Sequence, residues 1–193
     1  MTRTDATNSA ALAAAGITLR QQPRADDEAA IRRMADATDF FRPDEVDVAC
    51  ELVRERLERG PESGYEFVLA DETASLSVGA PPRLLAYACF GPIACTVGSY
   101  DLYWIIVDPA HQGRGLGRLL IDAVERRVQA AAGRKVYIET SSLPRYAPTQ
   151  RFYDRCGYTL EARLPDFYQP GDDKLVYAKV VASASTRAQT PSE

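Results

Sequence analysis

The sequence predicts an α/β domain with a mixed sheet. Predicted strands alternate with predicted helices along most of the chain, which is typical of α/β proteins. Early and late in the chain, two predicted strands follow each other with no helix between them, and such neighbours favour antiparallel pairing. The strand at residues 100–107 is apolar on both faces, so we expect it at the centre of the sheet.

The individual elements follow from the spacing of apolar residues. Alternation predicts a strand, and repetition every three to four positions predicts a helix. The predicted strands cover residues 17–20, 65–70, 83–90, 100–107, 135–140, 158–163 and 174–181. The predicted helices run from residue 26 toward residue 40 and over residues 43–59, 116–131 and about 148–156. Pro43 favours a first helical turn, and Gly60, Gly133 and Gly157 favour helix ends.

Length and composition indicate one ordinary globular domain. The chain has 193 residues, with 23 Lys and Arg against 27 Asp and Glu, which gives a net charge of −4. We expect a single domain over residues 17–181, with disordered tails at 1–16 and 182–193. Mild acidity disfavours a nucleic-acid partner, which would require a basic patch.

Cysteine and histidine usage excludes several kinds of site. The four cysteines have no C-x-x-C spacing, so we expect free and mostly buried thiols. One histidine cannot build a multi-histidine zinc site, and no metal is expected. The chain has no long apolar run typical of a secretory signal or a membrane span, so we expect a cytoplasmic protein with no membrane partner.

The main chemical signal is a glycine-rich turn after the central strand, Gln112-Gly113-Arg114-Gly115-Leu116-Gly117. Glycines let backbone N–H groups converge on an anion, and the following helix N-terminus adds a positive dipole end. The turn therefore suits a phosphate, although simple tight-turn geometry is the alternative. It is neither a P-loop, which needs Lys and then Ser or Thr where Arg118 and Leu119 stand, nor the dinucleotide pattern, which needs Gly at Arg118.

The spacing of Gln112, Gly115 and Gly117 resembles the pyrophosphate signature of the GNAT superfamily of acyl-CoA-dependent N-acyltransferases. The segments 107–109 and 152–158 also match that family's pattern, and together the similar features cover roughly residues 84–180. The resemblance implies a mixed, mostly antiparallel sheet of six to seven strands that is splayed at its centre, with about four helices. It also implies acetyl-CoA as co-substrate and no metal.

The resemblance further implies how acetyl-CoA binds. Backbone amides of residues 113–117 would hold the pyrophosphate, with Arg114 or Arg118 adding charge unless they are merely solvated. Backbone groups of the central strand would pair with the pantetheine amides, and the thioester would lie where that strand splays from the one ending at Thr140. The cofactor-binding residues are expected to be Ile105, Ile106, Val107, Gln112, Gly113, Arg114, Gly115, Leu116, Gly117 and Arg118.

Acyl transfer to an amine needs an acid, an oxyanion donor and a base. Tyr153 stands at the family's general-acid position, and its phenol, with a pKa of ~10, can protonate a desolvated thiolate whose thiol has a pKa of ~8.5. Simple packing of the Tyr153 ring on the sheet is the alternative. A backbone N–H near Val107 would hold the oxyanion. Asp101 and Glu139 are the candidate bases, and either carboxylate could instead be structural.

Two other reactive side chains near these positions are expected to have no catalytic role. His111 is expected at the surface of a turn, and Cys156 as a buried structural thiol.

Two polar and aromatic segments, residues 139–146 and 166–173, are expected to build the acceptor pocket, with residues 170–173 forming a hairpin turn. The candidate substrate-binding residues are Phe41, Thr140 and Tyr168. The resemblance favours acetyl transfer from acetyl-CoA to the primary amine of a small molecule by direct attack in a ternary complex. Transfer to a protein N-terminus or lysine, and a non-catalytic acyl-CoA-binding sensor, remain the alternatives, and a homodimer is left open.

Overall fold

The computed structural model describes residues 16–73 and 82–181. The strands are β1 (Ile17–Arg20), β2 (Glu66–Glu72), β3 (Leu84–Pro92), β4 (Ser99–Val107), β5 (Lys135–Ser141), β6 (Thr159–Gln169) and β7 (Asp172–Val180). The α-helices are α2 (Asp27–Thr38), α3 (Pro43–Arg59), α4 (Leu116–Ala130) and α5 (Ala147–Arg155). The tails predicted at 1–16 and 182–193 lie outside the described residues, apart from Gly16.

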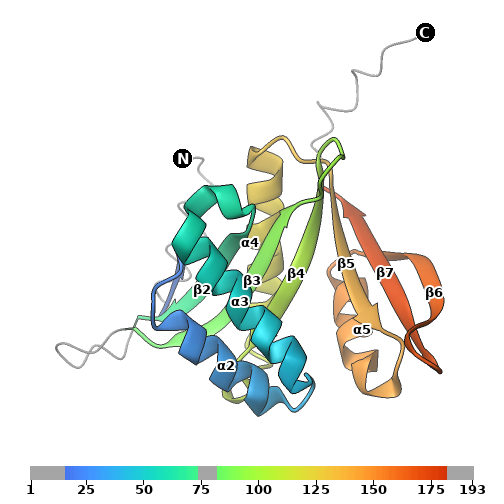
Figure 1. Ribbon diagram of the computed structural model, residues 1–193, viewed down its shortest axis with the longest axis horizontal. Coiled ribbons are helices and arrows are strands. Elements are labelled where there is room, and N and C mark those ends of the chain that lie inside the picture. Colours follow the sequence, from blue (N-terminus) through green and yellow to red (C-terminus); the bar gives the residue numbers. More distant parts are fainter. Residues whose placement is uncertain (1–15, 74–81, 182–193) are drawn as a thin grey trace, which may run out of the picture. The chain divides into compact units, whose positions relative to one another are not determined.

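The strands form one seven-stranded sheet in the order β1-β2-β3-β4-β5-β7-β6 (Figure 1). The pairs β1–β2, β5–β7 and β6–β7 are antiparallel, whereas β4–β5 is parallel. This confirms the predicted mixed, mostly antiparallel sheet. It also confirms the central position expected for β4, which has three strands on either side.

The chain groups into two compact units. Of the described residues, the first unit comprises residues 16–73 and 82–89 and Trp104–Leu120, and the second comprises Phe90–Tyr103 and residues 121–181. The single domain expected over residues 17–181 stays a prediction.

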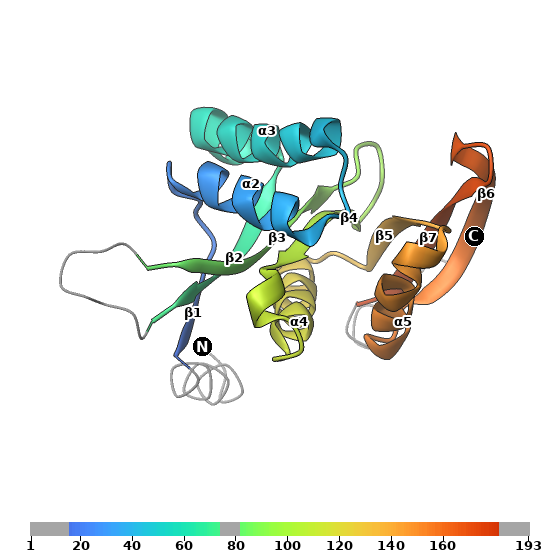
Figure 2. The ribbon, with the colours of Figure 1, turned by 90° about the horizontal axis from the view of Figure 1, so that it is seen from below.

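In the first unit, α2 and α3 lie side by side on one face of β1–β3 (Figure 2). Their apolar faces pack on the strands because apolar residues recur every three to four positions in each helix. Pro43 begins α3, and the Glu45 carboxylate accepts a hydrogen bond of 2.8 Å from the Arg42 N–H, which closes the first turn. The buried cluster consists of Ile31, Met34, Ala35, Val46, Ala49, Leu52, Val53, Phe67, Leu69, Leu84, Tyr87, Cys89 and Ile106.

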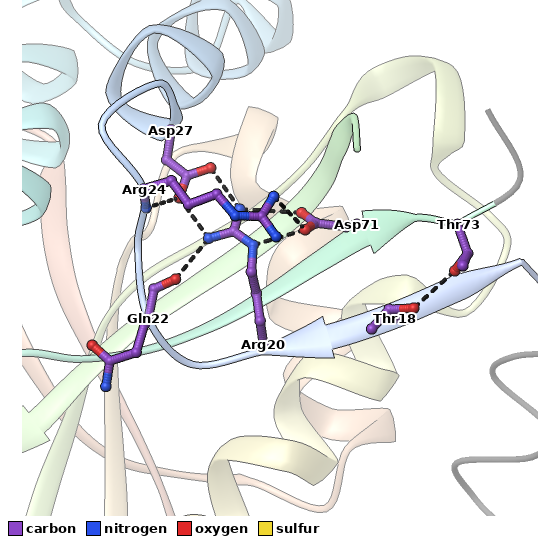
Figure 3. Close-up of polar contacts among 7 residues, drawn as sticks. All are labelled: Thr18, Arg20, Gln22, Arg24, Asp27, Asp71 and Thr73. Carbon is purple, nitrogen blue, oxygen red and sulfur yellow. Dashed lines mark hydrogen bonds and ion pairs between the residues drawn. The ribbon is translucent and has the colours of Figure 1, made fainter. Parts of the chain in front are cut away.

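The first unit also contains a buried charged network at the end of β1 (Figure 3). The Arg20 guanidinium donates two hydrogen bonds of 2.6 Å to Asp27, and its Nε lies 2.7 Å from Asp71 Oδ2. Asp27 and Asp71 are each only 3% exposed. Asp27 also accepts a hydrogen bond of 2.6 Å from the Arg24 backbone N–H. The network therefore fixes β1, β2 and the start of α2 together.

In the second unit, α5 packs on the strands through an aromatic cluster. The Tyr153 ring centroid lies 5.8 Å from that of Tyr177 and 6.3 Å from that of Tyr158. Near these rings, Lys179 Nζ donates to both oxygens of Glu125 at 2.8 Å and to the Cys156 carbonyl at 2.9 Å, which ties β7 to α4 and to the end of α5.

Two local predictions are corrected by the structure. Residues 170–173 are not all a turn: only Pro170 and Gly171 connect the strands, and Asp172 already pairs with Gln169. The strand predicted to end at residue 163 continues to Gln169 through irregular pairing, because the Asp173 carboxylate accepts the Asp166 N–H at 2.8 Å and fixes the strand tip. Residues 166–169 of the segment expected to build the acceptor pocket are therefore part of β6.

The free-thiol prediction is confirmed. All four cysteines are free; Cys50, Cys89 and Cys156 are buried and Cys95 is exposed. Within residues 16–73 and 82–181, no helix is long and apolar enough to cross a membrane.

Candidate active site

The glycine turn of the first unit follows β4 through a 3₁₀ turn, Pro109–His111. Asp108 begins this turn, and its carboxylate accepts the Ala110 N–H at 2.9 Å and a hydrogen bond of 2.6 Å from Arg83. Burial acts to raise the pKa of Asp108, but the Ala110 N–H and the Arg83 guanidinium outweigh it and hold that pKa below its ordinary value. The carboxylate is therefore ionised at neutral pH and fixes the start of the loop.

The loop itself has the backbone conformation that its glycines permit. Gly113 and Gly115 have φ angles of +75° and +83°, in the left-handed region that other residues rarely adopt. The Gln112 amide donates to the Val107 carbonyl at 3.3 Å, and the Leu119 N–H donates to the Gly115 carbonyl at 3.0 Å, where α4 begins. A strand, a glycine turn and a helix N-terminus thus succeed one another, as an anion site of this kind requires.

The side chains of this loop differ in how far they are exposed. Gln112, Gly113, Arg114, Gly115 and Arg118 are exposed, Gly117 is half-buried, and Leu116 is buried at 2% exposure. Leu116 therefore anchors the helix to the core, and only its backbone N–H can serve a ligand.

On the final part of β4, Ile106 is buried in the core, whereas Ile105 and Val107 are half-buried. Next to them, the Phe41 and Trp104 rings meet edge to face, with centroids 4.9 Å apart. Phe41 therefore packs against the strand expected to hold the pantetheine.

In the second unit, Tyr153 is 4% exposed and lies within the aromatic cluster of α5 and β7. Burial, and secondarily the neighbouring Cys156 and Tyr177, raise the pKa of its phenol. The hydroxyl therefore stays protonated over the whole range in which enzymes work. Packing and proton donation are compatible at this position, and the general-acid role stays a prediction.

The two candidate bases also lie in the second unit, close enough to interact. Asp101 on β4 is half-buried, and its pKa is raised first by burial and then by the Glu139 carboxylate, while Lys174 lowers it. Glu139 on β5 is exposed and forms an ion pair of 2.6 Å with Lys174 on β7.

The strand register places the candidate bases and Thr140 on opposite faces of the sheet. Asp101 is opposite Tyr137, two residues before Glu139, so both carboxylates lie on one face of the strands. Thr140 is buried on the other face, opposite Leu175, where Tyr177 and Tyr153 also lie. Tyr168 is exposed on β6, and its ring lies 5.9 Å from Lys174 Nζ. The structure thus places Tyr168 near Lys174, the ion-pair partner of Glu139, and separates Thr140 from the two carboxylates.

The expectation for His111 is half right. It lies in the turn, but it is buried at 9% exposure and not at the surface, with Nδ1 3.6 Å from Asp108 Oδ2. Cys156 is buried as expected and forms the end of α5.

Sequence reasoning missed Asp108, Arg83 and Lys174. Asp followed by Pro is a recognisable helix-start signal and could have indicated Asp108. Nothing local indicates Lys174, because its pairing with Glu139 depends on the β5–β7 register. Over the part of the chain that the structure describes, no group of three His, Cys, Asp or Glu side chains could hold a metal ion.

Comparisons with known proteins agree with this geometry. Residues 64–160 match the family described as an acetyltransferase (GNAT) domain. The chain is similar to a crystal structure of a Desulfovibrio desulfuricans protein assigned to the GNAT family of acetyltransferases, with 44% identity, a TM-score of 0.80, and coverage of 86% of this chain and 99% of that one. A search of curated proteins found no match.

Two more distant structures share the fold. One is the ribosomal-protein-S18-alanine N-acetyltransferase of Escherichia coli, with 15% identity, a TM-score of 0.65, and coverage of 92% and 99%. The other is yncA of Salmonella typhimurium, solved with its cofactor acetyl-CoA, with 20% identity, a TM-score of 0.63, and coverage of 86% and 94%.

Proposed function

Because the chain belongs to the GNAT family of acetyltransferases, we propose that it transfers the acetyl group of acetyl-CoA to the primary amine of a small molecule. The observation that carries the cofactor part is the glycine turn between β4 and α4, with Gly113 and Gly115 in the left-handed conformation. Its backbone N–H groups and the dipole of α4 suit the pyrophosphate, and Arg114 and Arg118 are exposed for charge at the rim. The backbone of Ile105, Ile106 and Val107 would pair with the pantetheine amides.

The reaction requires direct attack by the neutral amine in a ternary complex. The amine nitrogen bonds to the thioester carbon, the carbon–sulfur bond breaks, and the departing thiolate takes the proton of Tyr153. A backbone N–H near Val107 would hold the oxyanion. The substrate ammonium gives one proton to a carboxylate before the attack, and Asp101 and Glu139 are the candidates for that carboxylate. The nitrogen loses a second proton after it has bonded to the carbon, and this proton restores the Tyr153 phenol.

The acceptor is proposed to be a cationic amine. Two carboxylates, Asp101 and Glu139, lie on one face of β4 and β5 with the single ammonium of Lys174, so this cluster has a net negative charge. The exposed Tyr168 ring lies on the adjoining hairpin. Carboxylates and aromatic rings both attract an ammonium group.

Replacing Gly115 with glutamate is expected to weaken acetyl-CoA binding about 100-fold. The loop would lose one or two of its backbone hydrogen bonds to the pyrophosphate, and hydrogen bonds to a charged group are worth ~1.5–3 kcal/mol each. A Cβ at this glycine would meet no atom within 4 Å, so the fold should persist. The loss arises from the strained φ angle of +83° and from the added negative charge. Titration calorimetry with acetyl-CoA measures it.

The matched control is Gly64→Glu, which adds the same side chain at a φ angle of +76° with no atom within 4 Å, away from the loop. This variant should bind acetyl-CoA like the wild type. Equal affinity of the Gly115 variant and the wild type would remove the loop from the cofactor site.

The enzyme hypothesis is tested by mixing the purified protein, acetyl-CoA and a panel of small amines, including diamines and amino sugars, and measuring free thiol and acetylated product. We expect thiol release that depends on the amine, with one acetyl group found per thiol by mass spectrometry. Release with peptide N-termini or peptide lysines alone would contradict the small-molecule acceptor. Acetyl-CoA binding without turnover on any amine would favour a sensor.

A further inference from the structure

A cluster of three charged side chains lies on one face of the second unit. It consists of the two candidate bases and one lysine. Asp101, Glu139 and Lys174 come from the adjacent strands β4, β5 and β7. Glu139 is opposite Val176, two residues from Lys174, so the lysine and the carboxylates share this face. The cluster therefore has two negative charges and one positive charge.

Lys174 is held in place from two sides. Its Nζ lies 2.6 Å from Glu139 Oε2 and 3.6 Å from the centroid of the Phe167 ring, and its side chain is only 13% exposed. Phe167 is fixed in turn, because the hydrogen bond from the Asp166 N–H to Asp173 holds the tip of β6. An ammonium group placed over a ring and against a carboxylate has little freedom to move.

Other titratable groups near this cluster are Tyr137, Lys135 and Glu161, and they contact one another. Tyr137 lies opposite Asp101, and Lys135 Nζ lies 5.0 Å from the centroid of its ring. Lys135 also forms an ion pair of 2.6 Å with Glu161 on β6. The charges that act on Asp101 are those of Glu139 and Lys174.

We propose that Lys174 is a positioning residue for acetyl transfer: it holds Glu139 in an ion pair and leaves Asp101 as the carboxylate that accepts the proton of the acceptor ammonium. This inference rests on the proposed function. Glu139 is the less suitable base, because accepting a proton would break its ion pair with Lys174. Among the described residues, Asp101 has no ion pair of that kind to lose, and its half-buried position favours proton uptake.

The arrangement gives the two partners opposite effects on Asp101. The Glu139 charge raises the pKa of Asp101, whereas the Lys174 charge lowers it. A base is active when it is deprotonated, so kcat/KM should rise with pH through this pKa. Removing Lys174 should therefore move the acid limb of the profile to higher pH, and removing the Glu139 charge should move it to lower pH.

The experiment compares pH profiles of kcat/KM for Lys174→Met, Glu139→Gln and the wild type, all with the same amine so that its own titration is shared. We expect shifts of about one pH unit in opposite directions, as close charges produce. The double variant should lie between the single variants, near the wild type. Asp101→Asn should lose the acid limb and most of the turnover.

Lys135→Met is the matched control, because it breaks a lysine–glutamate ion pair of the same 2.6 Å length on the same face. Its acid limb should coincide with that of the wild type. Unshifted limbs in both test variants, shifts in the same direction, or an acid limb that Asp101→Asn keeps and Glu139→Gln loses would overturn the proposal. Each of these results requires wild-type turnover, so they differ from the complete absence of turnover, which would contradict the proposed function instead.

Discussion

Replacing Arg20 with methionine is expected to lower the free energy of unfolding by about 3–5 kcal/mol, because the change leaves two buried carboxylates without their main partner. Arg20 bonds Asp27 and Asp71 at 2.6–2.7 Å, and both acids are 3% exposed (Figure 3). Arg24 reaches Asp71 at 3.1 Å, but its side chain is 43% exposed and cannot replace the buried guanidinium. Urea denaturation of both proteins measures the difference.

Two further variants distinguish the buried network from ion pairs in general. Arg54→Met breaks the exposed ion pair with Glu28, which has a length of 3.1 Å, and should leave the unfolding midpoint almost unchanged. Adding Asp27→Asn and Asp71→Asn to Arg20→Met should restore part of the lost stability, since it removes the unpaired charges. An Arg20→Met variant as stable as the wild type would show that the network contributes little.

Replacing Tyr153 with phenylalanine is expected to lower kcat at least 100-fold while leaving the KM for acetyl-CoA nearly unchanged, because a general acid contributes about 10²–10⁴ to the rate. The substitution removes one hydroxyl and keeps the ring that packs against Tyr177. Burial raises the pKa of this phenol, so the wild-type enzyme should not lose activity through Tyr153 ionisation as the pH rises toward 10. Steady-state kinetics of thiol release measures both parameters.

Tyr177→Phe provides the matched control, since it removes a hydroxyl from the same aromatic cluster and this tyrosine is also buried. It should retain turnover within a few-fold of the wild type. Thermal denaturation should show that both variants are folded. If Tyr153→Phe were as active as Tyr177→Phe, the role of Tyr153 would be packing alone.

The sequence predicted the elements and the loop because both depend on local patterns. A short apolar run located β4, and its apolar character on both faces placed it at the centre of the sheet, as found. The glycines at 113 and 115 marked a turn that needs left-handed backbone, and both have positive φ angles. Such signals depend on a few consecutive residues.

Partners that are distant in sequence could not be predicted in this way. The ion pair between Glu139 and Lys174 depends on the antiparallel register of β5 and β7, which no short pattern encodes. The bonds from Arg20 to Asp71 depend likewise on the pairing of β1 with β2. The strand period of two could have shown that Glu139 and Thr140 point to opposite faces, and that they do not share one pocket wall.

The β6 strand has a further consequence for the behaviour of the protein in solution. It is the last strand of the sheet, and all eleven of its residues are exposed. Such a margin could template the addition of a foreign strand and so promote aggregation. Pro165 supplies no N–H for a new ladder, and the irregular register between Leu164 and Gln169 interrupts the regular spacing of donors and acceptors. The distortion that places Phe167 over Lys174 therefore also protects the margin of the sheet against uncontrolled self-association.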